Sequence, residues 1–198
     1  AQQVLTKAGA KDGDALILTK PLGSGTILAA EMAMAQVPPL MLGEVVTACF
    51  AQMRRPLAQA SEILAPQAHA MTDVTGFGLL GHLLEVCQGS NLSATIDLKN
   101  VPLLDEAVID YLEQGCVPGG STRNWQSISQ HISGTDQQSQ TLLCDPQTSG
   151  GLLVAVAPDH ANAVSELLKD AGCYHLPIGT LGQVTEPSPG RATIKVLS

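Results

Sequence analysis

Apolar runs and helical spacings alternate along the chain and predict its secondary structure. Short apolar runs bounded by polar or turn residues predict β-strands. Apolar residues that recur about every 3.6 positions predict helices. The predicted strands are 15–19, 69–74, 92–98, 151–157, 178–185 and 192–197, and the predicted helices are 26–35, 40–54, 57–64, 79–87, 104–114 and 158–171. This alternation predicts a layered α/β domain with helices on at least one face of its sheet.

Proline and glycine divide these elements and leave one long stretch without a regular pattern. Pro158 stands at the first position of the last helix, where proline is best tolerated. Gln88-Gly89 is predicted to cap helix 79–87. Residues 117–140 are polar and contain Gly119-Gly120, so we predict the longest irregular segment there. Long loops in compact domains are typically functional or mobile.

The composition is that of one folded domain. The chain has 198 residues, of which 44% are hydrophobic and 14% charged, with no run of like charges. It opens at Ala1 rather than at methionine, and its first residues look like an interior linker. We therefore expect a fragment in which residues 1–14 are the remnant of a linker from a missing N-terminal domain and residues 15–198 form a C-terminal α/β domain.

Charge and aromatic content exclude several classes of partner. Ten Lys and Arg residues stand against eighteen Asp and Glu, giving a formal net charge of −8, and the basic residues are scattered. Aromatic residues make up 3%, too few for a platform on which bases stack. No apolar run is long enough to cross a bilayer, and no signal segment opens the chain. We expect no nucleic-acid or membrane partner and a cytoplasmic location.

The cysteines and histidines do not form a recognisable site. The five cysteines are odd in number and lie far apart, which suits neither a disulfide framework nor a metal knuckle, so we interpret them as buried inert thiols: Cys49, Cys87, Cys116, Cys144 and Cys173. The five histidines show no zinc-binding spacing, and we interpret them as structural or solvated. No serine or cysteine catalytic triad is indicated.

The segment from Met71 to Gly78 carries the first candidate chemistry. Asp73 stands at the end of a predicted strand, and Gly76 and Gly78 come just before a helix. A carboxylate there suits magnesium, and glycines let backbone amides approach a phosphate at a helix N-terminus. Equally, Asp73 or Thr75 caps the helix and the glycines make the turn. The spacing leaves both interpretations open, because the lysine of a P-loop is absent.

Two further loops offer weaker candidates. The polar segment 144–151 leads directly into an apolar strand, and its small residues suit either donation to phosphate or ordinary turn formation. The segment 19–25 places Lys20 and a Gly-x-Gly pair ahead of a helix. A single Gly-x-Gly is not specific.

Four motifs, in order and spacing, resemble the selenide, water dikinase family. They are TKPLGSG at 19–25, AMTDVTGFGLLGHL at 70–83, VPGGSTRN at 117–124 and LCDPQTSGGLLVAV at 143–156. The resemblance extends from about 15 to 197 and corresponds to the C-terminal domain of that family. It implies a three-layer α-β-α domain with a mixed sheet, partly ferredoxin-like, similar to the C-terminal domain of aminoimidazole ribonucleotide synthetase.

The resemblance also implies a function. The family makes selenophosphate, AMP and phosphate from ATP, selenide and water, with magnesium between aspartates and the ATP phosphates. It implies that Asp73 is a magnesium ligand and that Gly76 and Gly78 lie beside the phosphates. The remaining aspartates, the catalytic cysteine or selenocysteine and its lysine belong to the N-terminal half. We therefore assign no catalytic residue here and expect this fragment alone to be inactive, within a full-length protein that is a homodimer.

Two alternatives stay open at this point. One is another ATP-binding member of the aminoimidazole ribonucleotide synthetase superfamily, such as a thiamine-phosphate kinase. The other is a non-catalytic regulatory module that keeps the fold without the chemistry. Stabilisation by nucleotide that depends on both magnesium and Asp73 would separate an ATP-using enzyme from such a module.

Overall fold

The computed structural model describes residues 5–34, 39–184 and 193–197. The strands are β1 (Ala15–Leu18), β2 (Ala68–Asp73), β3 (Leu92–Asp97), β4 (Ile132–Ser133), β5 (Leu152–Val156), β6 (Leu176–Gln183) and β7 (Ile194–Leu197). The helices are α1 (Ser24–Met32), α2 (Pro39–Met53), α3 (Ala58–Leu64), α4 (Gly78–Ser90), α5 (Ala107–Glu113), α6 (Gly119–Ile128), α7 (Gln137–Leu143) and α8 (Pro158–Asp170), with short 3-10 turns η1 (Leu98–Asn100) and η2 (Ser129–His131).

The strands form one mixed sheet in the order β2-β5-β1-β6-β3-β7-β4. The first five strands in this order are β2, β5, β1, β6 and β3, and neighbours among them pair antiparallel. Strand β7 pairs in parallel with both β3 and β4. Because β5 runs antiparallel to both β1 and β2, these two strands end at the same edge of the sheet, where β5 begins. The predicted candidate residues lie at this edge.

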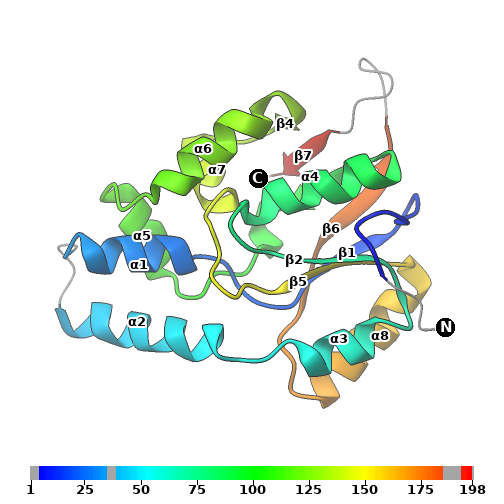
Figure 1. The fold of residues 1–198 in the computed structure, drawn as a ribbon, viewed down its shortest axis with the longest axis horizontal. Helices are drawn as coiled ribbons and strands as arrows, with labels where there is room; N and C mark the ends of the chain where they lie inside the picture. The colour runs from blue at the N-terminus through cyan, green and yellow to red at the C-terminus, as the bar shows by residue number, and fades with distance from the viewer. Residues whose placement is uncertain (1–4, 35–38, 185–192, 198) are drawn as a thin grey trace.

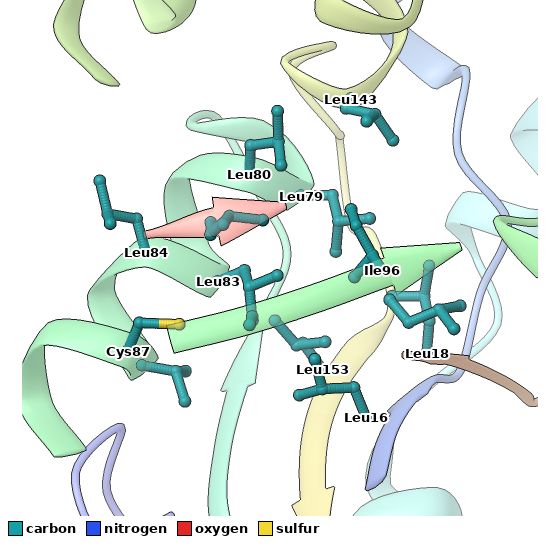
Figure 2. Packing of buried hydrophobic residues seen from close by; sticks show 14 of the residues in the cluster. Leu16, Leu18, Leu79, Leu80, Leu83, Leu84, Cys87, Ile96, Leu143 and Leu153 are labelled. Carbon is teal, nitrogen blue, oxygen red and sulfur yellow. The ribbon is translucent and has the colours of Figure 1, made fainter. Parts of the chain in front are cut away.

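One face of the sheet is covered by α4, with α6 and α7 beside it (Figure 1). Figure 2 shows the leucines of α4 lying over the strands that carry Ile96 and Leu153. In β1, Leu16 and Leu18 face this helix layer, as alternation along a strand requires. The leucine-rich sequence of α4 is explained by this burial, since its residues from Gly78 to Leu84 are all buried.

The opposite face of β1, β5 and β2 is covered by α3 and α8 (Figure 1). Ile17 of β1 faces this layer together with Val154 and Val156 of β5. Every residue of β5 is buried because the strand has helices on both of its faces. This explains its continuous apolar sequence and confirms the predicted three-layer α-β-α class with a mixed sheet.

A third cluster of apolar side chains lies beside the sheet, among α1, α2 and α5 (Figure 1). Ile27 of α1, Val45 of α2 and Tyr111 of α5 belong to it. This cluster fixes α1, and therefore the loop before it, relative to the sheet. None of the helices in the described ranges is long and apolar enough to span a membrane.

The prediction of an irregular segment over 117–140 is wrong. The segment contains α6, η2, β4 and the start of α7. Its glycines lower helix propensity, but the packing of α6 requires one of them, because a Cβ on Gly120 would lie 2.5 Å from Cγ of Pro146. Helix α7 begins at Gln137 and is capped by Asp136, whose carboxylate accepts a hydrogen bond from the Ser139 amide at 2.8 Å. Tertiary packing and capping therefore outweigh composition here.

The prediction that Gln88-Gly89 caps α4 is also wrong. The helix continues to Ser90 and ends at Asn91, whose left-handed backbone (φ +54°) is one that asparagine tolerates. Gly89 lies inside the helix, and a Cβ there would contact Ala8 at 3.4 Å. The other predicted elements exist, with ends that differ by up to three residues. The predicted ends at Ala35, Thr185 and Ala192 lie outside the described residues.

Candidate functional site

Asp73 is the last residue of β2, at the sheet edge where β1 ends and β5 begins. It is exposed, although Thr72 and Val74 beside it are buried. Within the described residues its carboxylate makes no hydrogen bond and no ion pair. The backbone pairing with Leu152 holds its position. Asp73 is therefore an unpartnered carboxylate at a paired strand end, an arrangement that suits a metal ligand.

The turn after Asp73 presents backbone amides to solvent. Gly76 and Phe77 are exposed, and among the described residues their N–H groups donate to no protein acceptor. A Cβ on Gly76 would meet nothing within 4 Å, so the backbone there is open. The alternative that Asp73 or Thr75 caps α4 is wrong, because Phe77 is the N-cap residue and no side chain bonds to the cap.

Gly78 has a different role from Gly76. It is buried, its φ is +71°, and a Cβ would lie 2.7 Å from the carbonyl carbon of Cys144. Only glycine adopts this conformation without strain and also permits this contact. Gly78 therefore packs the turn against the loop that precedes β5.

Asp145 is fully buried in that loop and connects it to the start of α1. Its Oδ1 accepts a hydrogen bond from the Thr26 hydroxyl at 2.9 Å, and its Oδ2 accepts one from the Gly25 amide at 3.0 Å. Gln147 Nε2 donates to the same Oδ2 at 2.7 Å. Burial raises the pKa of the Asp145 carboxyl from 3.8 to about 6, while these hydrogen bonds act in the opposite direction. The carboxyl is structural, because protein donors surround it.

Gln147 connects three loops. Its Oε1 accepts hydrogen bonds from the amides of Gly23 and Ser24 at 3.2 and 3.3 Å and from the Ser24 hydroxyl at 3.1 Å. The backbone N–H of Gln147 donates to the carbonyl oxygen of Thr75 at 3.0 Å. The loop before α1, the turn before α4 and the loop before β5 are therefore held as one unit.

The glycine pair before β5 serves close packing. A Cβ on Gly150 would lie 2.1 Å from the carbonyl oxygen of Val74, and one on Gly151 would lie 2.4 Å from the amide nitrogen of Lys20. The two glycines are therefore needed for close backbone contact, and the structure shows no turn at either of them. Thr148 and Ser149 are exposed, so the loop also presents two hydroxyl groups to solvent.

Asn124 on α6 adds the last connection. Its Nδ2 donates to the carbonyl oxygens of Gly76 and Cys144 at 2.8 and 3.0 Å. All four sequence motifs therefore meet around the turn after Asp73. Sequence reasoning did not single out Asp145, Gln147 or Asn124, although each lies inside a quoted motif. Their polarity within segments rich in turn residues was the available signal.

Two histidines have the structural role that was predicted. His82 on α4 is buried; its Nε2 lies 3.2 Å from the Thr75 hydroxyl and its Nδ1 lies 3.0 Å from Glu85. Lys7 also pairs with Glu85, at 2.6 Å. Burial raises the pKa of Glu85, but the hydrogen bonds from Lys7 and His82 outweigh it and lower the pKa. His69 pairs with the buried Asp14 at 2.9 Å.

Four of the five thiols are in environments that disfavour nucleophilic chemistry, whereas Cys173 is only half-buried, so its predicted burial is wrong. Cys49, Cys87, Cys116 and Cys144 are buried. Burial raises the pKa of Cys87 and of Cys144 to about 12 each. Burial, with the charges of Asp145 and Glu31, raises the pKa of Cys49 to about 11. A thiol with such a pKa is almost entirely protonated near neutral pH and is a weak nucleophile.

Asp73 offers a free carboxylate for a metal at this edge of the sheet, and the described residues do not form a closed metal site. No group of three or more His, Cys, Asp or Glu side chains in the described ranges can hold a metal ion. Magnesium commonly takes one or two protein carboxylates and completes its shell with phosphate oxygens and water. Asp73, with exposed backbone amides beside it, fits one side of such an open site.

Comparisons with known proteins agree with this fold and these motifs. The chain is 44% identical over 185 residues to the selenide, water dikinase of Haemophilus influenzae (strain 86-028NP), covering 93% of this chain and 52% of that protein. It is 46% identical over 187 residues to that of Colwellia psychrerythraea (strain 34H), covering 90% and 51%. The chain therefore spans about half the length of the curated relatives it matches, and the resemblance seen in the motifs is confirmed.

Solved structures of lower identity share the fold. A thiamine-monophosphate kinase from Stenotrophomonas maltophilia K279a superposes with a TM-score of 0.64 at 17% identity, covering 97% of this chain and 53% of that one. The hydrogenase maturation protein HypE in complex with ATP gives 0.63 at 15% identity, covering 97% and 50%. The family model described as "AIR synthase related protein, C-terminal domain" matches residues 11–195. The chain therefore belongs to this family.

Proposed function

We propose that this chain is the C-terminal domain of a selenide, water dikinase, which converts ATP, selenide and water into selenophosphate, AMP and phosphate. The observation that carries the proposal is the unpartnered Asp73 carboxylate at the point where all four motifs meet. The identity of 44% to a selenide, water dikinase over 93% of the chain supports it. The similarity of fold to a kinase is compatible with it.

In this proposal the chain supplies one side of a magnesium–ATP site. Asp73 is a magnesium ligand, and the backbone at Gly76 lies beside the phosphates with its N–H directed to an anion. Gly78 supports that turn from beneath, through its contact with Cys144. Magnesium, when bound, offsets negative charge on the phosphoryl oxygens. The hydrogen bonds of Gln147 and Asn124 keep the turn fixed, so that little ordering is needed when ATP binds.

The rest of the site is proposed to lie outside this chain. Further aspartates, the cysteine or selenocysteine nucleophile and a lysine come from an N-terminal domain, to which residues 1–14 connect. That domain also supplies the contacts of a homodimer, and the whole enzyme is cytoplasmic. Because the nucleophile and the further aspartates are proposed to lie in that domain, the 198-residue chain alone has no dikinase activity. Selenophosphate formation by the purified chain would contradict this last point.

The experiment is selenide-dependent AMP formation by the full-length protein at saturating magnesium, wild type against Asp73→Asn. Loss of a metal ligand should lower activity by about a hundredfold or more. Asp159→Asn is the matched control, because Asp159 is an exposed aspartate on α8 and lies outside the four motifs. Equal activity of both variants would refute the role of Asp73. No selenide-dependent AMP from wild type would refute the dikinase assignment and favour another ATP-using enzyme of the same fold.

A further inference from the structure

A small cavity of about 210 Å³ lies at the same edge of the sheet as Asp73, among the end of α2, α3 and the connection between α8 and β6. Two cationic residues line it, Lys20 and Arg55, and none of its lining residues is acidic. Its other polar lining residues are Thr19, Gln52, Gln59 and Tyr174. Two cations without a carboxylate form an unusual concentration of positive charge in a chain of net charge −8.

Lys20 is the more constrained of the two cations. It is only 3% exposed, and the only hydrogen bond that its Nζ makes in the described part of the chain is to the carbonyl oxygen of Ser149, at 2.8 Å. Burial lowers the pKa of Lys20, and the positive charge of Arg55 lowers it further. A buried ammonium group costs free energy unless an opposite charge accompanies it. An anion in the cavity would supply that charge.

The other groups at the cavity are hydrogen-bond donors. Arg55 is exposed, and its guanidinium group has no ion pair or hydrogen bond among the described residues. The Thr19 hydroxyl accepts a hydrogen bond from the Leu152 amide at 2.8 Å, and its own proton has no acceptor in the described ranges. Burial raises the pKa of Tyr174, which keeps the phenol neutral and able to donate. A cluster of donors with two positive charges matches the oxygens of a tetrahedral anion.

We propose that this cavity, the Lys20–Arg55 pocket, binds a phosphate group. Its volume is below the roughly 300–1,000 Å³ of pockets for drug-sized ligands, which suits one small ion or one group of a larger ligand. The proposal does not depend on the function proposed above, because every group that carries it belongs to this pocket and not to Asp73.

Two sources of the phosphate group are compatible with the position of the pocket. One is free orthophosphate. The other is a phosphate of a nucleotide that also reaches Asp73, since β1 and β2 lie on either side of β5 and neighbouring strands are about 4.8 Å apart, which places their backbones roughly 10 Å from each other. The experiment below distinguishes these sources.

The test is isothermal titration calorimetry of the full-length protein at low ionic strength, with orthophosphate in the absence of magnesium and, separately, with ADP and magnesium. Arg55→Gln removes the exposed cation, and Arg54→Gln is the matched control, because Arg54 is the adjacent exposed arginine and does not line the pocket. Lys20→Met is a second variant, used only where circular dichroism shows a native fold. Asp73→Asn separates this pocket from the proposed metal site.

We expect Arg55→Gln to weaken binding by about tenfold or more, as loss of a charge-assisted contact predicts, and Arg54→Gln to leave it unchanged. Orthophosphate binding that Asp73→Asn preserves would support the pocket with the free ion as ligand. If Arg55→Gln weakens the binding of ADP but not that of orthophosphate, the pocket is supported with a nucleotide phosphate as its ligand. Equal affinities of the Arg54 and Arg55 variants for both probes, or saturable binding of neither probe by wild type, would overturn the proposal.

Discussion

Replacing Asp145 by asparagine should remove a pH-dependent loss of stability. Asp145 is fully buried; its Oδ2 accepts hydrogen bonds from the Gly25 amide and from Gln147, and its Oδ1 accepts one from the Thr26 hydroxyl. Asparagine can keep its oxygen toward the two N–H groups and direct its amide to Thr26, because a hydroxyl can accept as well as donate. These three hydrogen bonds can therefore be kept while the buried charge is lost.

The sign and the size follow from the pKa of this carboxyl. The folded protein holds the Asp145 proton up to about pH 6, whereas the unfolded chain releases it near 3.8. Protonation therefore favours the folded state, and the stabilisation present below pH 3.8 is lost as the pH rises through about 6. At 1.36 kcal/mol for each pKa unit, the complete loss is about 3 kcal/mol. Roughly half of it, 1–2 kcal/mol, falls between pH 5 and pH 8.

The assay is urea unfolding of the chain and of Asp145→Asn at pH 5 and at pH 8, with the difference in unfolding free energy taken at each pH. Groups common to both proteins cancel in this difference. The Cys49 thiol, whose pKa Asp145 influences, titrates near 11, outside the range used. We expect Asp145→Asn to gain roughly 1–2 kcal/mol relative to wild type between the two pH values. A difference that is the same at both would refute the reasoning.

Two further predictions concern the glycine turn and the thiols. Gly78→Ala combines a φ of +71° with a contact 2.7 Å from the Cys144 backbone, so it should lower the free energy of unfolding in urea by roughly 2–4 kcal/mol. Gly115→Ala, at φ +80° with open space around it, should lower it by only about 1–2 kcal/mol. Equal losses would show that the contact is unimportant. In the native chain a thiol reagent should modify the half-buried Cys173 first, and mass spectrometry that found Cys144 modified as fast would contradict its burial.

The hydrophobic pattern predicted most of the fold because burial decides most of its elements. The apolar run of β5 reports helices on both faces of the sheet, and the leucines of α4 report a helix that is buried from Gly78 to Leu84. The pattern failed over α6 and α7, whose sequences are polar. There the helices depend on a contact between Gly120 and Pro146 and on a cap at Asp136, and neither has a periodic signature. The pairing of β7 with β3 also joins segments that are distant in sequence.

The candidate site was predictable in its chemistry and less so in its construction. Asp73 and Gly76 could be chosen from their place between a strand and a helix, and both are exposed there. The supporting groups could not, because their partners lie far away in sequence. Asp145 reaches Thr26 across 119 positions, and Asn124 reaches Gly76 across 48. Such contacts require the fold itself, which single-sequence patterns do not specify.

The hydrogen bonds of Gln147 have a consequence for protein engineering. Because its side chain bonds to the loop before α1 and its backbone bonds to the turn after Asp73, neither segment can be exchanged for that of a relative without disturbing the other. A chimera whose imported turn follows a different backbone path would leave polar groups of the recipient, such as the Gln147 backbone N–H, unpaired, at about 1–3 kcal/mol for each. Transplanting a new specificity into this scaffold therefore requires the three loops to be moved as a cassette, together with Asn124 on α6.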